Sequence, residues 1–251
     1  MQRTNIEWVK NPDGSPGFTW NPITGCLNNC SYCYARRLAN GRLRQRYLAH
    51  HDYVQQLMVN DIRIQGHPDQ DPFYPRFWEM RLIEILDGKP KGIFVCNMGE
   101  LFGDWVPKEW QEQIFRVIKV ANQHRFYLLT KQPQNLAKFS PFPQNCWIGV
   151  TATGSKQFLR AIGLQGLGGI RAVVKFISFE PLLENIQPDE GSLRDIDWVV
   201  IGGQSHPTVY PPEKWIQEIE QAADKADIPV FEKNNLRAQW LKLPRQEMPK
   251  S

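Results

Sequence analysis

Long apolar runs are missing from this sequence. No window approaches the roughly 20 uninterrupted apolar residues that a membrane-spanning helix needs. The first ten residues, MQRTNIEWVK, also lack the apolar core of a secretion signal. We therefore expect a cytoplasmic protein without a membrane partner. A large excess of one charge is absent too, because 30 Lys and Arg stand against 26 Asp and Glu, for a net charge of +4. This balance permits a phosphate-bearing partner without requiring one.

Cysteine is scarce, with only five in 251 residues. An odd number, with three of them packed into eight residues, does not suit a disulfide framework in a chain of this length. Hydrophobic residues make up 41% of the sequence and charged residues 22%, which excludes a wholly disordered or fibrous chain. The composition therefore predicts a compact fold, and the clustered cysteines indicate a metal site.

Apolar, β-branched runs recur along the chain and predict buried strands. These runs are Phe18–Thr24, Gly92–Asn97, Phe126–Thr130, Trp147–Thr151, Val173–Ser178, Trp198–Gly202 and Val230–Phe231. Amphipathic stretches opened by a proline predict helices over Pro107–Asn122 and Pro212–Ala226. Repeated strand–helix units favour a parallel sheet. We therefore predict an α/β fold, a complete or partial (β/α) barrel of six to seven parallel strands, with a doubly wound open sheet as the alternative.

About 60 residues separate Cys33 from the second predicted strand. We predict a helical insertion over residues 35–90, which contains the basic stretch Arg36–Arg46 and the proline- and aromatic-rich Asp71–Trp78.

No Gly/Ser linker, low-complexity tract or repeat of fixed period divides the chain. The sequence therefore predicts a single domain over residues 1–251. The stretch from Leu236 onward is expected to form an exposed end.

The clustered cysteines Cys26, Cys30 and Cys33 have the spacing C-x3-C-x2-C. Three thiolates on one short loop can hold three corners of an iron–sulfur cube, whereas clusters with structural or electron-transfer roles normally have four cysteine ligands. The fourth iron would then be open to another ligand. The alternative is a zinc ion completed by a distant His or Cys. Structural zinc usually has paired arms of Cys or His, and no second arm is visible.

With the aromatic Tyr32 before the third cysteine, this segment resembles the signature of the radical S-adenosylmethionine (radical SAM) superfamily. The resemblance implies a 4Fe-4S cluster whose open iron binds the amino and carboxylate groups of S-adenosylmethionine (SAM). It further implies reductive cleavage of SAM to methionine and a 5'-deoxyadenosyl radical, with Tyr32 near the adenine. The protein would hold cofactor and substrate in register and exclude water and oxygen. An electron donor such as ferredoxin or flavodoxin is the implied partner.

Most of the chain is similar to an uncharacterised, often phage-encoded family of radical-SAM-like proteins. The segments that carry this similarity are NIEW, TWNPITGC, ELFGDWVP, YLLTKQP, FISFEPLL and DWVVIGGQS. The family is distantly similar in layout to spore photoproduct lyase, which uses the same radical to reverse a thymine lesion in DNA. One departure is Gln204, which stands where the family has a glutamate after the paired glycines.

In a (β/α) barrel the working residues lie where strands finish. After the second predicted strand, Asn97-Met98-Gly99-Glu100 resembles the Gly-Gly-Glu segment that the superfamily uses to hold the methionine amino group. Only Gly99 and Glu100 match, and Asn97 is the alternative polar contact. The other interpretation of Glu100 is a surface carboxylate at a helix start.

The fourth and fifth predicted strands end in further polar residues. In the superfamily that the chain resembles, hydroxyl groups at this place contact the ribose or the carboxylate of SAM. The resemblance therefore implies this role for Thr151 or Thr153. In Ser178-Phe179-Glu180-Pro181, the proline stops the strand and leaves Glu180 facing the barrel mouth. We expect Thr151, Thr153, Ser178 and Glu180 to bind the cofactor, and Glu180 to have a partner because an unpaired buried charge is costly.

Four more residues are candidates for catalysis: Cys96, Lys131, Gln204 and Lys233. Lys131 and Lys233 follow strands and would form a positive rim for an anionic substrate, although a lone lysine is more often solvated. Gln204 follows two glycines that permit a close approach to a ligand or a tight turn. Cys96 is either a core residue or a hydrogen-atom donor to a substrate radical.

Three functions compete at this point. The first is a radical enzyme that repairs or modifies DNA, RNA or a nucleotide. Its phosphates would be bound by a run of arginines with Tyr47 nearby to stack on a base: Arg36, Arg37, Arg42, Arg44 and Arg46. A solvated helix face is the other interpretation of this basic run. The second function is the same chemistry on a small molecule or peptide. The third is a non-catalytic iron–sulfur or zinc module that binds a partner.

Overall fold

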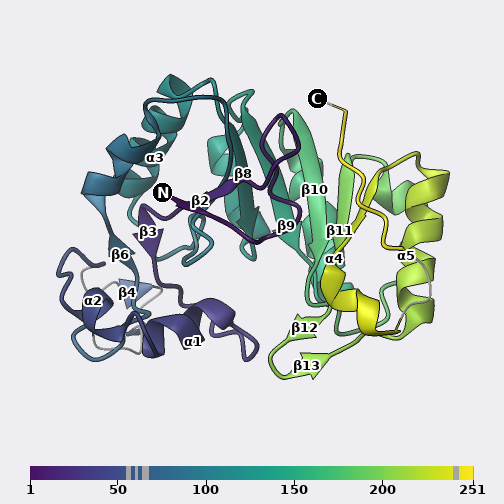
Figure 1. The fold of residues 1–251 in the computed structure, drawn as a ribbon, viewed down its shortest axis with the longest axis horizontal. Coiled ribbons are helices and arrows are strands. Elements are labelled where there is room, and N and C mark those ends of the chain that lie inside the picture. The colour runs from purple at the N-terminus through teal and green to yellow at the C-terminus, as the bar shows by residue number, and fades with distance from the viewer. Residues whose placement is uncertain (55–57, 60–61, 64–67, 240–242, 251) are drawn as a thin grey trace. The chain divides into compact units, whose positions relative to one another are not determined.

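The computed structural model describes residues 1–54, 58–59, 62–63, 68–239 and 243–250. By its contacts the chain divides into two compact units. The first unit comprises Met1–Asn5 and Val9–Phe126, and the second comprises Ile6–Trp8 and Tyr127–Ser251. The fold is mixed α/β, with helices and a main sheet of eight mostly parallel strands (Figure 1). The predicted α/β class is therefore confirmed, whereas the single domain stays a prediction.

The first unit contains three strands of the main sheet, several helices and several short strands. Its elements are β1 (Gln2–Arg3), β2 (Phe18–Trp20), β3 (Ile23–Thr24), α1 (Tyr34–Asn40), α2 (Arg44–Leu48), β4 (Met58–Val59), β5 (Ile62–Arg63), β6 (Arg76–Phe77), the 3-10 helix η1 (Glu79–Ile85), β7 (Gly92–Val95) and α3 (Lys108–Val120). Strand β8 (Arg125–Thr130) begins here and continues in the second unit. Strand β2 runs parallel to β7, with Phe18 opposite Ile93, and antiparallel to β1.

The predicted strand Phe18–Thr24 is wrong as one element. It forms two short strands in different sheets, since β3 pairs with β6 and not with β7. The break falls at Asn21-Pro22, where proline has no N–H to donate to a sheet. The side chain of Asn21 takes part in the turn instead, because its Oδ1 atom accepts from the backbone N–H of Met98 at 2.8 Å.

The predicted helical insertion over residues 35–90 is helical only in part. Its described residues hold α1, α2 and η1, together with the short strands β4, β5 and β6. Residues 55–57, 60–61 and 64–67 lie outside the described residues. Helices α1 and α2 bury Ala35, Ala39 and Tyr47 in a small cluster with Phe73 and Met98. This cluster fixes the two helices beside the cysteine loop.

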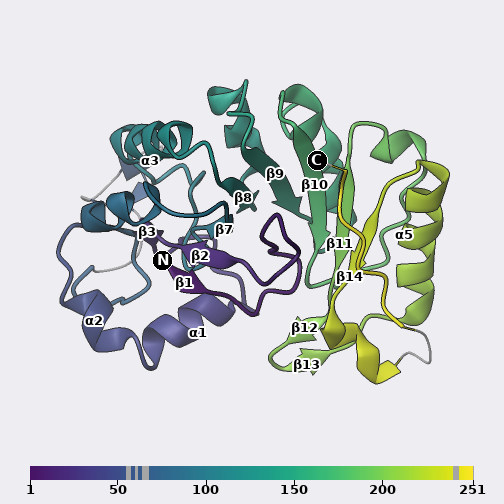
Figure 2. The ribbon, with the colours of Figure 1, turned by 45° about the horizontal axis from the view of Figure 1, so that its top comes forward.

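The second unit is a row of parallel strands with helices. Its elements are η2 (Pro133–Phe139), β9 (Cys146–Thr151), α4 (Ser155–Ile162), η3 (Leu167–Gly169), β10 (Val174–Phe179), η4 (Gly191–Leu193), β11 (Trp198–Ile201), β12 (Gln204–Ser205), β13 (Thr208–Val209), α5 (Glu213–Lys225), β14 (Val230–Glu232) and η5 (Asn234–Gln239). Strand β10 lies between β9 and β11, and β14 follows β11, all in parallel. Every residue of β9 and β11 is buried, as expected for parallel strands covered on both faces. Figures 1 and 2 show α5 alongside β11 and β14.

Aromatic rings fill the core of the second unit. The rings of Trp8, Trp147 and Phe176 each pack against Trp198, with centroids 6.0, 5.9 and 5.4 Å away. Strand β9 carries a glycine where Phe176 crosses it, because a Cβ atom on Gly149 would come within 2.3 Å of that ring. This close packing explains why β9 has a glycine, which lacks a side chain, at this position.

The end of the chain is hydrogen-bonded to β14. The backbone N–H of Glu232 donates to the carbonyl of Arg245 at 2.7 Å, and that of Glu247 donates to Val230 at 3.1 Å. The tail is therefore attached to the edge of β14 through an isolated bridge, while Leu243, Gln246, Glu247 and Lys250 are exposed, as the predicted exposed end requires. Residues 240–242 and 251 lie outside the described residues.

The finer part of the fold prediction, a complete or partial (β/α) barrel, stays a prediction. Within the described ranges, β14 is hydrogen-bonded to β11 and bridged to the tail at Gln246, and no closed barrel is seen. In the same ranges, no helix has the length and apolar character that crossing a membrane requires.

Candidate functional site

The cysteine loop joins β3 to α1 in the first unit. Gly25 opens it with a φ of +88°, and a Cβ atom there would lie 2.4 Å from the carbonyl oxygen of Tyr74. Only glycine tolerates this combination of a left-handed backbone and close contact. The backbone N–H of Gly25 donates to Met98 at 2.8 Å and that of Cys26 to Phe73 at 3.0 Å. The start of the loop is thus held between two other segments of the unit.

Two sulfur atoms of the loop accept backbone hydrogen bonds. The N–H of Asn28 donates to Sγ of Cys26 at 3.4 Å, and the N–H of Arg36 donates to Sγ of Cys33 at 3.3 Å. The second bond makes Cys33 the N-cap of helix α1. Cys26, Cys30 and Cys33 are all half-buried, unlike the two fully buried cysteines elsewhere in the chain. The loop therefore presents sulfurs that are partly accessible and already act as acceptors.

The thiols of the loop influence one another electrostatically. Burial raises the pKa of Cys26, and the carboxylate of Glu100 raises it further, as do Cys30 and Cys33, while the N–H of Asn28 opposes them. Cys30 and Cys33 thus contribute to the raised pKa of Cys26. A cation would reverse this balance, since a thiol that coordinates a metal is deprotonated.

The three cysteines of the loop are the side chains that would hold an iron–sulfur cube. Among the described residues, no group of three or more His, Cys, Asp or Glu side chains is placed to hold a metal ion. A cube makes a different demand, because each thiolate binds a different iron and the sulfurs need not converge on one point. Three neighbouring, half-buried thiols with N–H donors on two of the sulfurs are compatible with that demand.

The segment Asn97–Glu100 lies against the cysteine loop. Gly99 forms a parallel bridge with Gly25, and a Cβ atom on Gly99 would be 2.8 Å from the carbonyl oxygen of Ile23. Glu100 is only 4% exposed, and no helix starts there. Its carboxylate accepts from the side-chain amide of Asn28 at 3.3 Å and from the N–H of Phe102 at 3.1 Å. The interpretation of Glu100 as a surface residue at a helix start is therefore wrong.

Asn97 has structural partners in the same unit. Its Oδ1 atom accepts from the side chain of Asn21 at 2.8 Å, and its Nδ2 atom donates to the hydroxyl of Tyr34 at 3.1 Å. That hydroxyl donates in turn to the carbonyl of Asn97 at 2.8 Å. These bonds hold the strand end against the first residue of α1. Tyr32 is half-buried within the loop.

Cys96 has the environment of a core residue. It is 4% exposed, and burial raises the pKa of its thiol to about 12. Its backbone has a φ of +55°, which only a minority of non-glycine residues adopt. The N–H of Cys96 donates to the carbonyl of Trp20 at 2.8 Å and fixes this conformation at the end of β7.

Four candidate residues of the second unit lie at the ends of β9 and β10. Thr151, Thr153 and Ser178 are buried, and Glu180 is half-buried. The Oγ atom of Ser178 has no hydrogen-bond partner in the described part of the chain. The roles of these residues towards SAM remain predictions.

Glu180 forms an ion pair with Lys233. Both side chains are largely shielded from solvent. A Cβ atom on Gly202 would lie 3.0 Å from the Lys233 side chain and 3.2 Å from that of Glu180, so the glycine leaves room for the pair. Lys233 is thus paired within the unit rather than solvated.

Gln204 lies in the hairpin of β12 and β13, where its side-chain amide donates to the carbonyl of Pro207 at 2.9 Å. The glycine before it, Gly203, exchanges hydrogen bonds of 3.2 and 2.7 Å with the side chain of Asn235. The paired glycines lie before the hairpin, whose turn is at His206-Pro207, so the tight turn considered for them is wrong. Lys131 is half-buried just after β8.

Arg76 is a residue that the sequence reasoning missed. Its side chain is fully buried and donates to the carbonyls of His50 at 3.1 Å, Asp71 at 3.1 Å and Tyr74 at 2.7 Å. The segment that it holds contains Phe73, whose carbonyl accepts from Cys26. Arginine is usually exposed, so nothing in the sequence marks this position as buried.

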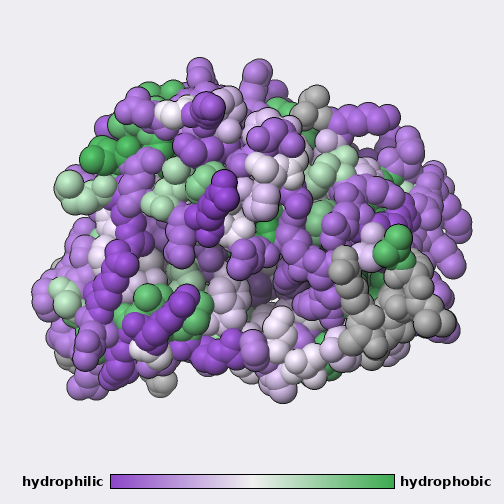
Figure 3. Space-filling model, in the orientation of Figure 1, coloured by the Kyte–Doolittle hydropathy of each residue, from purple (hydrophilic) through white to green (hydrophobic). Residues whose placement is uncertain are grey.

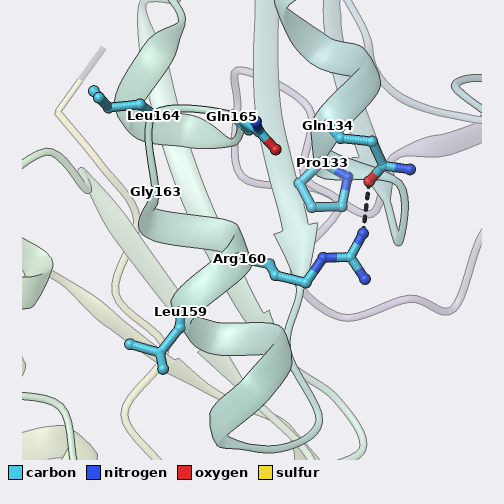
Figure 4. Close-up of a pocket in the computed structure, with 7 residues that line it drawn as sticks. All are labelled: Pro133, Gln134, Leu159, Arg160, Gly163, Leu164 and Gln165. Carbon is cyan, nitrogen blue, oxygen red and sulfur yellow. Dashed lines mark hydrogen bonds between the residues drawn. The ribbon is translucent and has the colours of Figure 1, made fainter.

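The second unit also contains a pocket of about 330 Å³ (Figure 4). It is lined by Pro133, Gln134, Leu159, Arg160, Gly163, Leu164 and Gln165. The guanidinium of Arg160 donates to Oε1 of Gln134 at 2.9 Å, a hydrogen bond between two of these lining residues. None of the residues proposed from sequence lines this pocket.

Fold and site together define a mixed α/β protein with a half-buried loop of three cysteines. The chain belongs to the DUF5131 family, described as a protein of unknown function, whose sequence profile matches residues 3–247. The match spans both compact units, so the family is defined by far more than the cysteine loop. No curated protein and no solved structure matches the chain.

Proposed function

We propose that this chain is a radical SAM enzyme in which Cys26, Cys30 and Cys33 hold a 4Fe-4S cluster. The observation that carries the proposal is the arrangement of three neighbouring, half-buried thiols on one loop, with backbone N–H donors to two sulfurs. Such hydrogen bonds stabilise negative charge on sulfur and tune the potential of a bound cluster. The spacing of the cysteines supports the same group.

The chemistry that such a cluster supplies is the transfer of one electron to SAM, which then cleaves to methionine and a 5'-deoxyadenosyl radical. The residues of the chain orient and shield the reactants. Glu100 is the proposed acceptor for the amino group of SAM, because its buried carboxylate is held beside the loop by Asn28. A preorganised carboxylate binds an ammonium group without the cost of ordering its own side chain.

The substrate class is the open part of this proposal. A nucleic acid or nucleotide is the first candidate, and a small molecule or a peptide is the second. A ferredoxin or flavodoxin is the proposed electron donor, since the reaction consumes one electron for each SAM that is cleaved.

The test is anaerobic reconstitution of the full chain with iron and sulfide. We expect about four irons per chain and an iron–sulfur signal in electron paramagnetic resonance after reduction. With SAM and dithionite, the protein should release 5'-deoxyadenosine and methionine in equal amounts. Alanine variants of Cys26, Cys30 or Cys33 should lose both iron and SAM cleavage.

Matched cysteine controls are Cys96→Ala and Cys146→Ala, which remove buried thiols outside the loop and should keep the iron. A cluster that forms but never cleaves SAM would point to a non-catalytic iron–sulfur module and overturn the proposed function. Stoichiometric zinc in place of iron would overturn it as well.

A further inference from the structure

The segment around helices α1 and α2 has an unusual charge. Between Asp13 and Asp52 the chain contains no acidic residue and no lysine, but five arginines. The net charge of this 38-residue stretch is therefore +5, more than that of the entire protein, +4. A local excess of this size creates a positive surface even in a nearly neutral chain.

The structure separates the five arginines into two groups. Arg36 is engaged internally, because its guanidinium pairs with Asp71 at 3.4 Å and donates to the carbonyl of Cys26 at 3.1 Å. The others are exposed: Arg37, Arg42, Arg44 and Arg46, although the guanidinium of Arg46 also lies 5.7 Å from the ring centroid of Trp78. Within the described residues, no carboxylate forms an ion pair with any of these four. Figure 3 shows strongly hydrophilic side chains, with hydrophobic ones among them, over the part of the surface where Figure 1 places α1.

Apart from Tyr34, the apolar residues of the two helices are buried or partly buried. Ala35, Ala39 and Tyr47 are buried, and Leu38 and Leu43 pack against the same cluster. Tyr47 therefore cannot stack on a nucleobase, which corrects the role considered for it from sequence. The burial of these residues also argues against a lipid surface as partner, because a helix that binds in a membrane interface needs an outward apolar face.

Tyr34 supplies the aromatic ring that Tyr47 does not. It is the first residue of α1, is 41% exposed, and has its hydroxyl anchored to the backbone of Asn97. A fixed, exposed ring offers a stacking surface for an unpaired base. Arginine rather than lysine is the cation throughout, and its planar fork suits phosphate oxygens.

We propose that α1, α2 and the turn between them form a binding surface for single-stranded nucleic acid. Arg37, Arg42, Arg44 and Arg46 contact the phosphates, and Tyr34 stacks on a base. Cys33 caps α1, so the bound strand lies next to the cysteine loop. This proposal rests on the proposed function in one respect only, since it makes a nucleic acid strand the substrate class of the radical enzyme.

The test is fluorescence anisotropy of a labelled 20-nucleotide DNA or RNA strand of mixed sequence with the full chain, before and after cluster reconstitution. With four phosphates neutralised, the affinity should fall about 50-fold between 50 and 200 mM salt, from a slope of roughly −0.7 per contact. Changing all four arginines to glutamine should abolish this salt dependence. Tyr34→Ser should weaken binding about tenfold at constant salt slope.

The matched control changes four other exposed cations to glutamine: Arg116, Lys119, Lys156 and Arg160. It alters the net charge equally and should retain most of the affinity. Equal losses in both quadruple variants would overturn the proposal, as would tighter binding to duplex DNA, to polyglutamate or to vesicles of anionic lipid. Strand binding without SAM cleavage would refute the proposed function alone, and SAM cleavage without strand binding would refute this surface alone.

Discussion

The backbone N–H of Arg36 donates a 3.3 Å hydrogen bond to the Sγ atom of Cys33, and this bond starts helix α1. One sulfur atom therefore has two proposed tasks. It caps the helix in the folded chain, and it is a proposed ligand of the cluster. The two tasks respond differently to substitution, because serine can replace cysteine as a cap but not as a soft metal ligand.

We expect Cys33→Ala to lower the free energy of unfolding of the metal-free protein by about 1 kcal/mol, the typical loss for a missing N-cap. Cys33→Ser should keep most of that stability because its hydroxyl oxygen accepts the same N–H bond. Urea titration followed by circular dichroism measures the difference. Both variants should fail to bind iron after reconstitution. A serine variant that retains full iron would contradict the assignment of Cys33 as a ligand.

Arg76 is expected to be the most sensitive arginine of the first unit. Arg76→Leu leaves the carbonyls of Asp71 and Tyr74 buried without their donor, and each such loss costs about 1 to 3 kcal/mol. We therefore predict a decrease of at least about 2 kcal/mol in the free energy of unfolding, measured by urea titration. Arg76→Lys should recover less than half of the lost free energy of unfolding. A single ammonium group cannot donate to the several carbonyls that the planar guanidinium reaches.

The matched control for this prediction is Arg116→Leu, at an exposed position of α3. Its effect should stay within about 0.5 kcal/mol, as is usual for surface substitutions. If Arg76→Leu is as mild as the control, the buried guanidinium does not hold the segment around Phe73.

The elements predicted best from the sequence are those whose signal is local. The run Trp147–Thr151 corresponds to β9 and the run Trp198–Gly202 to β11, because buried parallel strands read as continuous apolar runs. The prolines before α3 and α5 mark both helix starts to within a residue.

The strand pairings and the position of Glu100 could not be predicted from the sequence, because they depend on contacts between residues far apart in the chain. Ile23 pairs with Phe77 in a separate small sheet, which splits the first predicted strand. Gly25 and Gly99 form a bridge that places Glu100 beside the cysteine loop. Local propensity contains no information about such pairings. The spacing of the cysteines was visible from the start, but the surroundings of their sulfurs were not.

His124 should make the stability of the protein depend on pH. Its ring is 1% exposed, and its Nδ1 atom accepts from the backbone N–H of Lys91 at 3.2 Å, which requires a neutral imidazole. Burial lowers the pKa of His124 from its usual 6.5, and the charge of Lys91 lowers it further. As the pH falls below about 6.5, the unfolded chain binds a proton that the folded chain refuses, so folding loses stability.

We therefore expect the free energy of unfolding of the wild type to fall between pH 7 and pH 5 more steeply than that of His124→Gln. The difference in slope should reach up to about 1.4 kcal/mol per pH unit. Urea titrations of both proteins at several pH values measure it. Parallel curves for the two proteins would show that His124 does not set this dependence.

The end of the chain should stabilise the second unit. The indole N–H of Trp198 donates to the carbonyl of Glu247 at 3.0 Å, and the carboxylate of Glu247 accepts from the N–H of Val230 at 2.9 Å. The N–H of Arg245 donates to Glu232 at 2.8 Å. Removing residues 244–251 breaks all three bonds, at a net cost of about 0.5 to 1.5 kcal/mol each.

We predict that this truncation lowers the free energy of unfolding by at least about 1.5 kcal/mol and shifts tryptophan fluorescence to the red, because water then reaches the fully buried Trp198. Removing residues 248–251 alone is the matched control, since the three bonds come from Arg245 and Glu247, which it leaves in place. The shorter truncation should change neither quantity. Equal stability of the two truncated proteins would show that the tail does not stabilise the second unit. The burial of Trp198 would then depend on its packing against Trp147 and Phe176.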